Sequence, residues 1–405
     1  MRILYLHQYY NTPAMSGSTR SYEMARRLVY MGHEVNMVTS WREQCDKSGW
    51  FSTYDDGIKT YWLPVIYSNH MRYTDRIQAF IQFAWQASIM SASIPTDIVF
   101  ATSTPLTIAL PGVYASRKQR IPMVFEVRDL WPELPIAMGA IRNPLLKYIA
   151  KRLELFAYRN SAAIVALSPG MRDGVIANGY PSDRITVIPN GSDLDKFYPN
   201  KSTGKEFRKT HSIPENVIML TYVGTFGKVN GVEYIVELAS ALKEDRRIYF
   251  LTVGDGHEFD RVKALAIKKG CLGINLQMLP KIPKSEVSAV LAATDIAAST
   301  VIPLPELEAN SANKVFDGLA AGCCVAINHK GWQAELLSSS GAGFYLSASI
   351  DKATAELRDW INNPQRISVA GENARKLAEE QFSRDKLACD LEHVLLTAYA
   401  KKAYN

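Results

Sequence analysis

Short apolar runs alternate with longer stretches of helical spacing from one end of the chain to the other. In the first half, six apolar runs predict strands, and amphipathic stretches between them predict helices. The predicted strands are Ile3–His7, Val35–Thr39, Ile98–Ala101, Met123–Val127, Ile164–Leu167 and Ile185–Ile188. Continuous apolar strands divided by helices are typical of parallel sheets that are covered on both faces. The first half is therefore predicted to be a doubly wound α/β domain.

The same alternation begins again after a polar stretch, KSTGKEFRKTHSIPEN, at residues 201–216. Six further apolar runs predict a second parallel sheet with helices on both faces. These runs are Ile218–Val223, Ile248–Val253, Leu276–Leu279, Ile296–Ser299, Val325–Ile327 and Phe344–Leu346. The whole chain is thus predicted to hold two doubly wound α/β domains.

The stretch ITVIPNGSDLDKFYP marks the passage between the two predicted domains. Pro189 ends the last strand of the first sheet, and Asn190-Gly191 turns the chain toward the second domain. Sheets of this kind bind ligands at the carboxyl ends of their strands, so we expect the two domains to face each other across a cleft. We expect one domain at residues 1–195, a second at 196–384, and a last helix within 385–405.

Length and composition agree with this division. The chain has 405 residues, 47% of them hydrophobic and 21% charged, which is typical of a soluble globular protein. Its net charge of +6 is too small to indicate binding to nucleic acid. The five cysteines form no CxxC pair and favour reduced thiols in a cytosol, and the first ten residues show no signal peptide.

One uncharged stretch, between Arg76 and Asp97, is long enough to be considered as a membrane span. Gln78, Gln82 and Gln86 recur every four residues within it and would form a polar stripe along a helix. The stretch is therefore predicted to be an amphipathic helix, buried or lying on a surface, and not a span.

The strands of the second predicted domain are followed by residues suited to a phosphate. Gly224, Gly227 and Lys228 come directly after an apolar strand, and glycines let backbone approach an anion while lysine supplies a positive charge. Gly254 ends the next strand in a tight turn, Gly-Asp-Gly, which is a structural feature or a ligand contact.

The sharpest constellation is the helix that begins at Asn313. Asp317 lies one turn beyond Asn313 and near Lys314. A carboxylate there can accept hydrogen bonds from the vicinal hydroxyls of a sugar, and the helix N-terminus favours an anion. A solvated acid on a surface helix would give the same spacing.

In the first predicted domain, two segments could face the cleft. Gly17 stands between Ser16 and Ser18 in a loop that leads into a helix, where backbone N–H groups can meet an anion, although an ordinary loop has the same pattern. Arg128 and Asp129 follow a strand directly, so a catalytic or binding role is favoured for them.

Asp193 and Asp195 form a DxD, a pattern that can hold a divalent ion. Both lie beyond a turn on a linker, where alternate residues commonly face water. The seven histidines show no paired ligand spacing either. We therefore expect the two acids to face solvent and no metal site to be present.

Taken together, these stretches resemble family 4 glycosyltransferases, which are retaining enzymes of the two-domain GT-B fold with two Rossmann-like domains. The matching stretches, in family order, are SGSTRSYEMARRLVYMGHEV, VRDLWPE, ALSPGMRDGVIANGYPSDRITVIPNGSDLDKF, VGTFGKVNGVEYI and NKVFDGLAAGCCVAI. They cover nearly the whole chain. The forms DLWPE and NKVFDGLAAG are similar to the branch that builds bacterial O-antigen or capsule, including N-acetyl-fucosaminyl transferases. The resemblance also implies that the last helix, near Lys386–Lys401, returns to the first domain.

The resemblance implies a nucleotide diphosphate site on the second domain. Gly224 matches the family glycine that approaches the diphosphate. The family often has arginine where Thr225 stands and lysine where Asn230 stands, so the chain departs from the pattern at both positions. Lys228 is the nearest replacement cation.

Two further motifs of the family have counterparts in this chain, but each counterpart differs from the family pattern. Asp317 matches the second member of a pair of glutamates eight positions apart and is expected to bind ribose hydroxyls. Ala309 stands at the first position, which leaves Glu306 or Glu308 to contact the donor sugar. Arg128, next to Asp129, stands where the family has a histidine near the anomeric centre.

The implied function is transfer of a sugar, with retention, from a UDP-linked donor to a saccharide carried on undecaprenyl diphosphate. An N-acetylated deoxyhexosamine such as L-FucNAc is the suggested sugar, and neither a cofactor nor a metal is expected. Two alternatives stay open: an epimerase of the same fold, and a non-catalytic scaffold that would explain the departures.

A lipid-linked acceptor would place the protein on the inner face of the cytoplasmic membrane. Two predicted helices, Ile77–Met90 and Asn143–Tyr158, support this localisation because they combine apolar side chains with few acids. The second also carries Lys147, Lys151 and Arg152, which would attract anionic lipid. The alternative is that both helices pack on the sheet.

Overall fold

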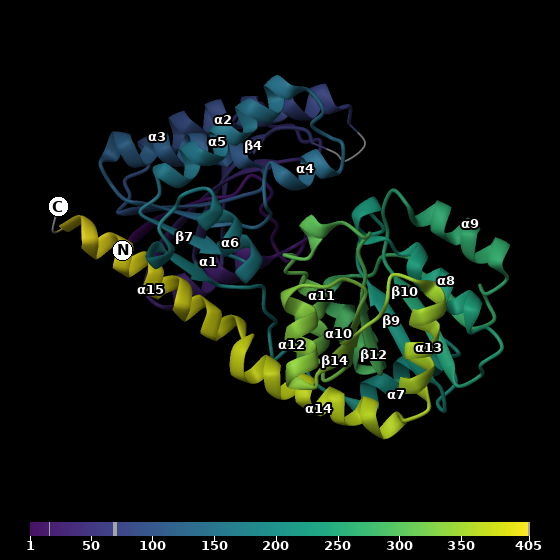
Figure 1. The fold of residues 1–405 in the computed structure, drawn as a ribbon. Coiled ribbons are helices and arrows are strands. Elements are labelled where there is room, and N and C mark those ends of the chain that lie inside the picture. Colours follow the sequence, from purple (N-terminus) through teal and green to yellow (C-terminus); the bar gives the residue numbers. More distant parts are fainter. Residues whose placement is uncertain (16, 68–70, 404–405) are drawn as a thin grey trace. The chain divides into compact units, whose positions relative to one another are not determined.

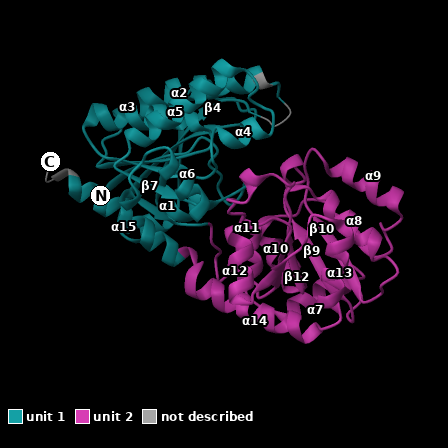
Figure 2. Cartoon of the chain, viewed as in Figure 1, with its two compact units in different colours: residues 1–189, 385–405 teal, residues 190–384 magenta. Residues whose placement is uncertain are grey.

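The structure is a computed structural model that describes residues 1–15, 17–67 and 71–403 (Figure 1). It divides the chain into two compact units, coloured separately in Figure 2. Unit 1 comprises Met1–Pro189 together with Asp385–Asn405, and unit 2 comprises Asn190–Arg384. The chain thus passes between the units twice, at Pro189 and at Arg384. The first passage comes six residues before the boundary that we expected at residue 195.

Unit 1 is built on an eight-stranded sheet in the order β3-β4-β2-β1-β5-β6-β7-β8. Its strands are β1 (Arg2–Leu6), β2 (Glu34–Trp41), β3 (Phe51–Asp55), β4 (Ile58–Pro64), β5 (Ile98–Thr102), β6 (Met123–Val127), β7 (Ala163–Ala166) and β8 (Ile185–Val187). All neighbours pair in parallel except β3 and β4, which form an antiparallel hairpin. The hairpin was not predicted, because β3 is largely exposed and β4 alternates buried and exposed residues.

Helices cover both faces of this sheet. They are α1 (Arg20–Tyr30), α2 (Tyr73–Ser93), α3 (Ala109–Gln119), α4 (Glu133–Ala137), α5 (Pro144–Arg159), α6 (Pro169–Ala177) and α15 (Arg384–Ala403). One core joins α1 and α15 to the sheet, with Leu387 and Leu391 of α15 packed beside Ile3 and Tyr5 of β1. On the other face α2, α3 and α5 lie side by side (Figure 1). The last helix therefore belongs to the core of unit 1.

Unit 2 holds a six-stranded parallel sheet in the order β11-β10-β9-β12-β13-β14. Its strands are β9 (Ile218–Val223), β10 (Ile248–Val253), β11 (Leu276–Leu279), β12 (Ile296–Ser299), β13 (Cys324–Ile327) and β14 (Gly343–Tyr345). Its helices are α7 (Lys201–Thr210), α8 (Glu233–Ala241), α9 (Phe259–Lys269), α10 (Lys284–Ala292), α11 (Asn313–Ala320), α12 (Trp332–Ser340), α13 (Ile350–Ile361) and α14 (Pro364–Gln381). Both units are thus Rossmann-like α/β domains, which confirms the predicted fold class.

The order of strands locates the place where each sheet can bind a ligand. In unit 2 the chain runs from β9 outward to β11 and then returns to the other side of β9 at β12. In unit 1 it runs from β1 outward to the hairpin and returns at β5. Loops diverge where the strand order reverses, so each sheet can bind a ligand there, at the carboxyl ends of its own strands. No helix within the described ranges is long and apolar enough to cross a membrane.

Candidate functional site

Lys314, Tyr222 and Gly224 lie together at the reversal point of unit 2, the place between β9 and β12 where the strand order reverses. Lys314 lies in the first turn of α11, and its Nζ donates to Tyr222 Oη at 3.0 Å and lies 4.3 Å from the centre of the Tyr222 ring. A Cβ atom placed on Gly224 would lie 3.3 Å from the same Nζ. Burial lowers the pKa of Lys314 to about 7. An ammonium ion in this place has no carboxylate partner among the described residues and would be stabilised by an anion near Gly224.

Neighbouring glycines allow the loops after β9 and β10 to pack backbone against backbone. A Cβ atom on Gly254 would lie 1.9 Å from the carbonyl oxygen of Gly224, and one on Gly256 would lie 2.7 Å from that of Phe226. A Cβ atom on Gly227 would lie 3.0 Å from the side-chain oxygen of Asn230. These glycines bring the two loops together, and the N–H groups of Gly224, Phe226 and Gly254 donate to the carbonyl oxygens of Val253, Asp255 and Leu279.

Thr225 and Lys228 are exposed at the same edge. Lys228 begins the short 3-10 helix Lys228–Asn230, which is tied to the end of β12 because Thr300 Oγ1 donates to the carbonyl oxygen of Asn230 at 2.7 Å. Of the two predicted lysines, Lys314 is therefore the one held against Gly224, and Lys228 projects into solvent.

Asp317, expected to bind ribose, lies one turn into α11 and is partly exposed. Its Oδ1 accepts a hydrogen bond of 2.7 Å from Ser192 Oγ. Burial raises the pKa of Asp317, while Arg384 and Lys284 oppose the shift by their positive charge. The carboxylate is thus held in a fixed orientation by the segment that enters unit 2.

Asp193 does not face solvent, contrary to the expectation from its place on a linker. Its side chain is buried and ion-paired with the buried Arg384, with Lys196 Nζ at 3.5 Å. The two chain passages pair at this point, because Ser192 N–H donates to the carbonyl oxygen of Phe382 at 3.0 Å. The ion pair of Asp193 with Arg384 therefore connects the two passages. Asp195 is exposed, as expected. No group of residues suited to a metal ion occurs in the described part of the chain.

The segment before α11 places acids near a histidine that the sequence did not single out. Glu306 is partly exposed, and its Oε2 is buried without a hydrogen-bond partner among the described residues. His329 follows β13 and is buried, and burial lowers its pKa while Glu308 raises it and Lys314 lowers it. Asn313 is the first residue of α11 and is partly buried. A histidine just after a buried strand was the signal that could have revealed this position.

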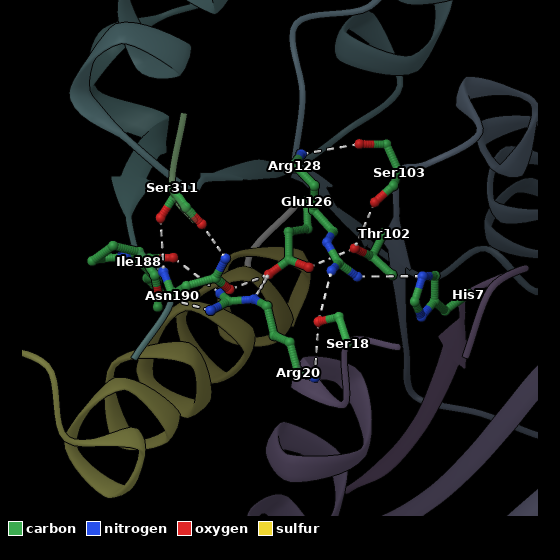
Figure 3. Close-up of polar contacts among 11 residues, drawn as sticks. His7, Ser18, Arg20, Thr102, Ser103, Glu126, Arg128, Ile188, Asn190 and Ser311 are labelled. Atoms are coloured by element: carbon green, nitrogen blue, oxygen red, sulfur yellow. Dashed lines mark hydrogen bonds and ion pairs between the residues drawn. The ribbon is translucent and has the colours of Figure 1, made fainter. Parts of the chain in front are cut away.

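The reversal point of unit 1 contains a buried ion pair (Figure 3). Arg20, the first residue of α1, donates from Nη2 to Glu126 Oε1 at 2.9 Å, and both side chains are buried. Arg20 also donates to the carbonyl oxygens of Ile188 and Pro189 at 2.9 and 2.7 Å. Thr102 Oγ1 donates to the other carboxylate oxygen of Glu126. A charged residue inside the apolar run VFEV was the sequence signal for this pair.

Arg128 lies beside this pair and is held by three contacts (Figure 3). Its Nη1 lies 3.3 Å from His7 Nε2, its Nη2 lies 3.4 Å from Ser18 Oγ, and its backbone N–H donates to Ser103 Oγ at 3.0 Å. The buried His7 has its pKa lowered well below 6.5 by burial and by nearby arginines. Arg128 thus presents a positioned guanidinium at the carboxyl end of β6.

Asp129 follows Arg128 in the chain, and Gly17 precedes Ser18, whose hydroxyl contacts Arg128. Burial raises the pKa of Asp129 to about 6, against the opposing effect of Arg128. Gly17 has φ of +120°, a backbone conformation that favours glycine, and a Cβ atom there would lie 2.7 Å from Asn11 Nδ2, which would have to move. Ser16, the other end of the predicted loop, lies outside the described residues.

Comparison with known proteins covers both units. Residues 17–191 match the model of the glycosyl transferase 4-like domain, and residues 204–377 match that of the glycosyl transferases group 1. The two matches follow each other in the chain and fall on unit 1 and unit 2.

Two relatives come from Escherichia coli. The chain is 21% identical to a putative colanic acid biosynthesis glycosyl transferase, WcaI, over 89% of this chain and 92% of that protein. It is 25% identical, over 62% of both chains, to UDP-Gal:alpha-D-GlcNAc-diphosphoundecaprenol alpha-1,3-galactosyltransferase. Neither relative is an N-acetyl-fucosaminyl transferase by name, so that particular similarity is not shown.

The fold is similar to that of sucrose-phosphate synthase from Thermosynechococcus elongatus, with a TM-score of 0.79, 14% identity and 99% of each chain covered. That similarity concerns the two-domain architecture. Together with the two domain matches, it shows that the chain belongs to the family 4 glycosyltransferases of GT-B fold.

Proposed function

We propose that this glycosyltransferase transfers a sugar from a UDP-linked donor to a saccharide carried on a lipid diphosphate, with retention of anomeric configuration. The observation that carries the proposal is Lys314, an ammonium placed against Gly224 at the N-terminus of α11, with no carboxylate partner among the described residues. A helix N-terminus and a desolvated cation both favour a diphosphate. The name of the 25% identical E. coli relative, which includes UDP-Gal and diphosphoundecaprenol, supports this choice of donor and acceptor.

In the proposed reaction, the bond between the anomeric carbon and the donor's β-phosphate breaks, and negative charge develops on the leaving diphosphate. Lys314 and the N-terminus of α11 stabilise that charge, so neither a metal ion nor a cofactor is required. Lys228 supplies a second, exposed cation. The acceptor hydroxyl attacks from the same face, and its proton passes to the leaving phosphate, which accounts for retention without an enzymic nucleophile.

The remaining predicted residues have roles in binding. Asp317 accepts hydrogen bonds from the ribose hydroxyls, in an orientation supported by Ser192. We assign Arg128, Asp129 and Glu306 to the donor sugar. An N-acetylated deoxyhexosamine such as L-FucNAc is the sugar that we propose, in bacterial O-antigen or capsule biosynthesis.

The proposed acceptor requires the protein to work at the inner face of the cytoplasmic membrane. Adjacent helices of unit 1 expose large apolar side chains that support peripheral binding. They are Ile81, Trp85 and Ile89 of α2, Leu110 and Tyr114 of α3, and Leu145, Tyr148 and Ile149 of α5. Trp85 is 70% exposed and Leu145 63%. Such a face can enter the boundary between headgroups and acyl chains.

The contacts of α5 distinguish which of its cations are available to anionic lipid. Lys151 Nζ lies 2.7 Å from Glu133 and 2.8 Å from Glu154, so its charge is already neutralised. Lys147 is partly exposed on the same helix. Lys147, and not Lys151, is therefore the lysine of this helix that would attract a lipid phosphate.

The proposal is tested by incubating the protein with UDP-sugars and a lipid-diphosphate saccharide and measuring release of UDP. We expect release that depends on the acceptor, and a product anomer, determined by NMR, that matches the donor. Release of UDP without acceptor, or epimerisation of the donor, would contradict the assignment as a transferase to lipid. An inverted anomer would contradict retention.

A further inference from the structure

Three arginines at the carboxyl edge of the unit 1 sheet form no ion pair with an acid among the described residues. Arg42 directly follows β2, Arg76 lies in the first turn of α2, and Arg128 directly follows β6. All three are partly buried. Within residues 1–15, 17–67 and 71–403, their hydrogen-bond partners are an asparagine, a tyrosine, a histidine and serines, and none forms an ion pair with a carboxylate.

Two of these arginines are attached to the loop that leads into α1. Arg42 Nη2 donates to Asn11 Oδ1, and Asn11 Nδ2 donates to the carbonyl oxygen of Ser18 at 3.2 Å. Arg128 Nη2 lies 3.4 Å from the hydroxyl of the same Ser18. The N–H end of α1 and two guanidinium groups therefore meet at one loop.

The third arginine is connected to the first through a pair of tyrosines. The rings of Tyr9 and Tyr67 lie 4.8 Å apart, centre to centre. Arg42 lies over Tyr9 at 5.8 Å, and Arg76 lies over Tyr67 at 5.4 Å and donates to its hydroxyl at 2.8 Å. The three arginines are thus connected through Tyr9, Tyr67, Asn11 and Ser18 into one set of side chains that runs from the start of α2 to the end of β6. We call this set the arginine wall.

The positive charge of this wall is not balanced locally. Burial lowers the pKa of Arg42, with Glu43 a weaker opposing influence, and Arg42 and Arg128 together lower the pKa of His7. Glu126 is occupied by Arg20, and Asp129, which interacts with Arg128, offers a single carboxylate to three arginines. Partly buried guanidinium groups without acids are costly unless an anion completes the site.

We propose that Arg42 and Arg76 bind the diphosphate of the lipid-linked acceptor, next to Arg128, which we assign to the donor sugar. This inference rests on the proposed function and assigns its acceptor site. Guanidinium groups match phosphate oxygens in a bidentate manner, and a diphosphate offers enough oxygens for several arginines. Arg76 lies in the first turn of α2, the helix whose exposed Ile81, Trp85 and Ile89 we place at the membrane, where a lipid-borne diphosphate lies.

The donor diphosphate explains the arginine wall less well than the acceptor diphosphate does. Unit 2 provides its own cations, Lys314 and Lys228, at the edge of its own sheet. The arginine wall also extends beyond the reversal point of unit 1 to the start of α2, which the donor does not require. A membrane-borne ligand accounts for that extension.

Calorimetry on the full chain with farnesyl diphosphate tests the proposal without any turnover. We expect R42Q/R76Q to weaken binding of farnesyl diphosphate by about tenfold or more, since each charge-assisted hydrogen bond commonly contributes that much. Affinity for UDP should be unchanged. Arg366 of unit 2, which also stacks on an aromatic ring, provides the control variant R366Q, which should bind both ligands as the unaltered protein does.

Measurements with farnesol and inorganic pyrophosphate show whether the affinity comes from the lipid chain or from the diphosphate. Weaker binding of farnesol than of farnesyl diphosphate, and competition by pyrophosphate, would support a diphosphate site that serves a lipid. Equal affinities for farnesol and farnesyl diphosphate, or an equal loss of UDP binding in R42Q/R76Q, would overturn the proposal. Failure of sugar transfer with diphosphate binding intact would instead contradict the proposed function, and circular dichroism of each variant would verify that it is folded.

Discussion

The ammonium of Lys314 should make nucleotide binding depend on pH. In the free protein its pKa is lowered to about 7 because burial between α11 and Tyr222 penalises the charged form. A diphosphate beside it favours the charged form and raises the pKa. Binding above pH 7 must therefore take up a proton, and affinity should fall as pH rises.

The size of the effect follows from the same pKa. With a pKa of about 7, about nine in ten free molecules hold a neutral amine at pH 8, so affinity should fall about tenfold per pH unit above 7. Binding at pH 8 should take up about 0.9 proton for the same reason. The terminal phosphate of UDP is largely ionised in this range, since the second pKa of a phosphate ester is about 6.

Two neighbouring groups do not titrate between pH 7 and pH 9. The pKa of His329 is lowered below 6.5 by burial, and that of Tyr222 is raised by burial, so both remain neutral. A slope in this range can accordingly be assigned to Lys314 among these three residues.

Calorimetry of UDP binding from pH 6 to pH 9, in buffers of different ionisation enthalpy, measures affinity and proton uptake together. Lys314→Arg should bind UDP without the slope, because guanidinium stays charged. Lys314→Met should lose both affinity and slope. Lys228→Met is the control and should keep the slope whatever its effect on affinity. Constant affinity of the unaltered protein between pH 7 and pH 9, or a slope that survives in Lys314→Met, would refute the reasoning.

Four further outcomes are expected. Asp317→Asn should raise the donor KM more than it lowers kcat and abolish discrimination against 2′-deoxy donors; a loss confined to kcat would argue against ribose binding. Transfer should survive EDTA, whereas loss that manganese restores would indicate a metal site. Arg384→Met should lower the free energy of unfolding by about 3 kcal/mol in urea, because it leaves Asp193 buried without its main partner; an unchanged midpoint would contradict this. Trp85→Ser should weaken binding to anionic vesicles about tenfold, and Ile267→Ser in unit 2, which is also apolar and exposed, should not.

Much of the fold was predictable from local pattern. Strands such as β5 and β10 are buried on both faces, so they are continuous apolar runs that identify a parallel sheet without reference to the rest of the chain. The hairpin β3–β4 was missed because one of its strands is largely exposed and carries no such run. Local pattern is informative where burial is complete and uninformative where a strand is half-covered.

Sequence position also located the residues that surround the two reversal points. Gly224 and Arg128 follow strands directly, and the carboxyl ends of parallel strands meet at one edge of a sheet. The roles of residues within that edge were not predictable. Lys314 and Lys228 were both candidates for a phosphate contact, yet packing places only Lys314 against Tyr222 and Gly224.

The tertiary structure decided what depends on partners distant in the chain. Asp193 looked like a solvated linker acid, but its partner Arg384 stands 191 residues away, and the pair is buried. Arg42 and Arg128 are likewise separated by strands β3 to β6, and they are brought together through Ser18 and Asn11. Burial and charge pairing are properties of the assembled sheet, because the groups that desolvate or neutralise a side chain come from other elements. The sequence by itself therefore determined the elements and the edge where chemistry can occur, and the folded chain determined which charges there remain unpaired.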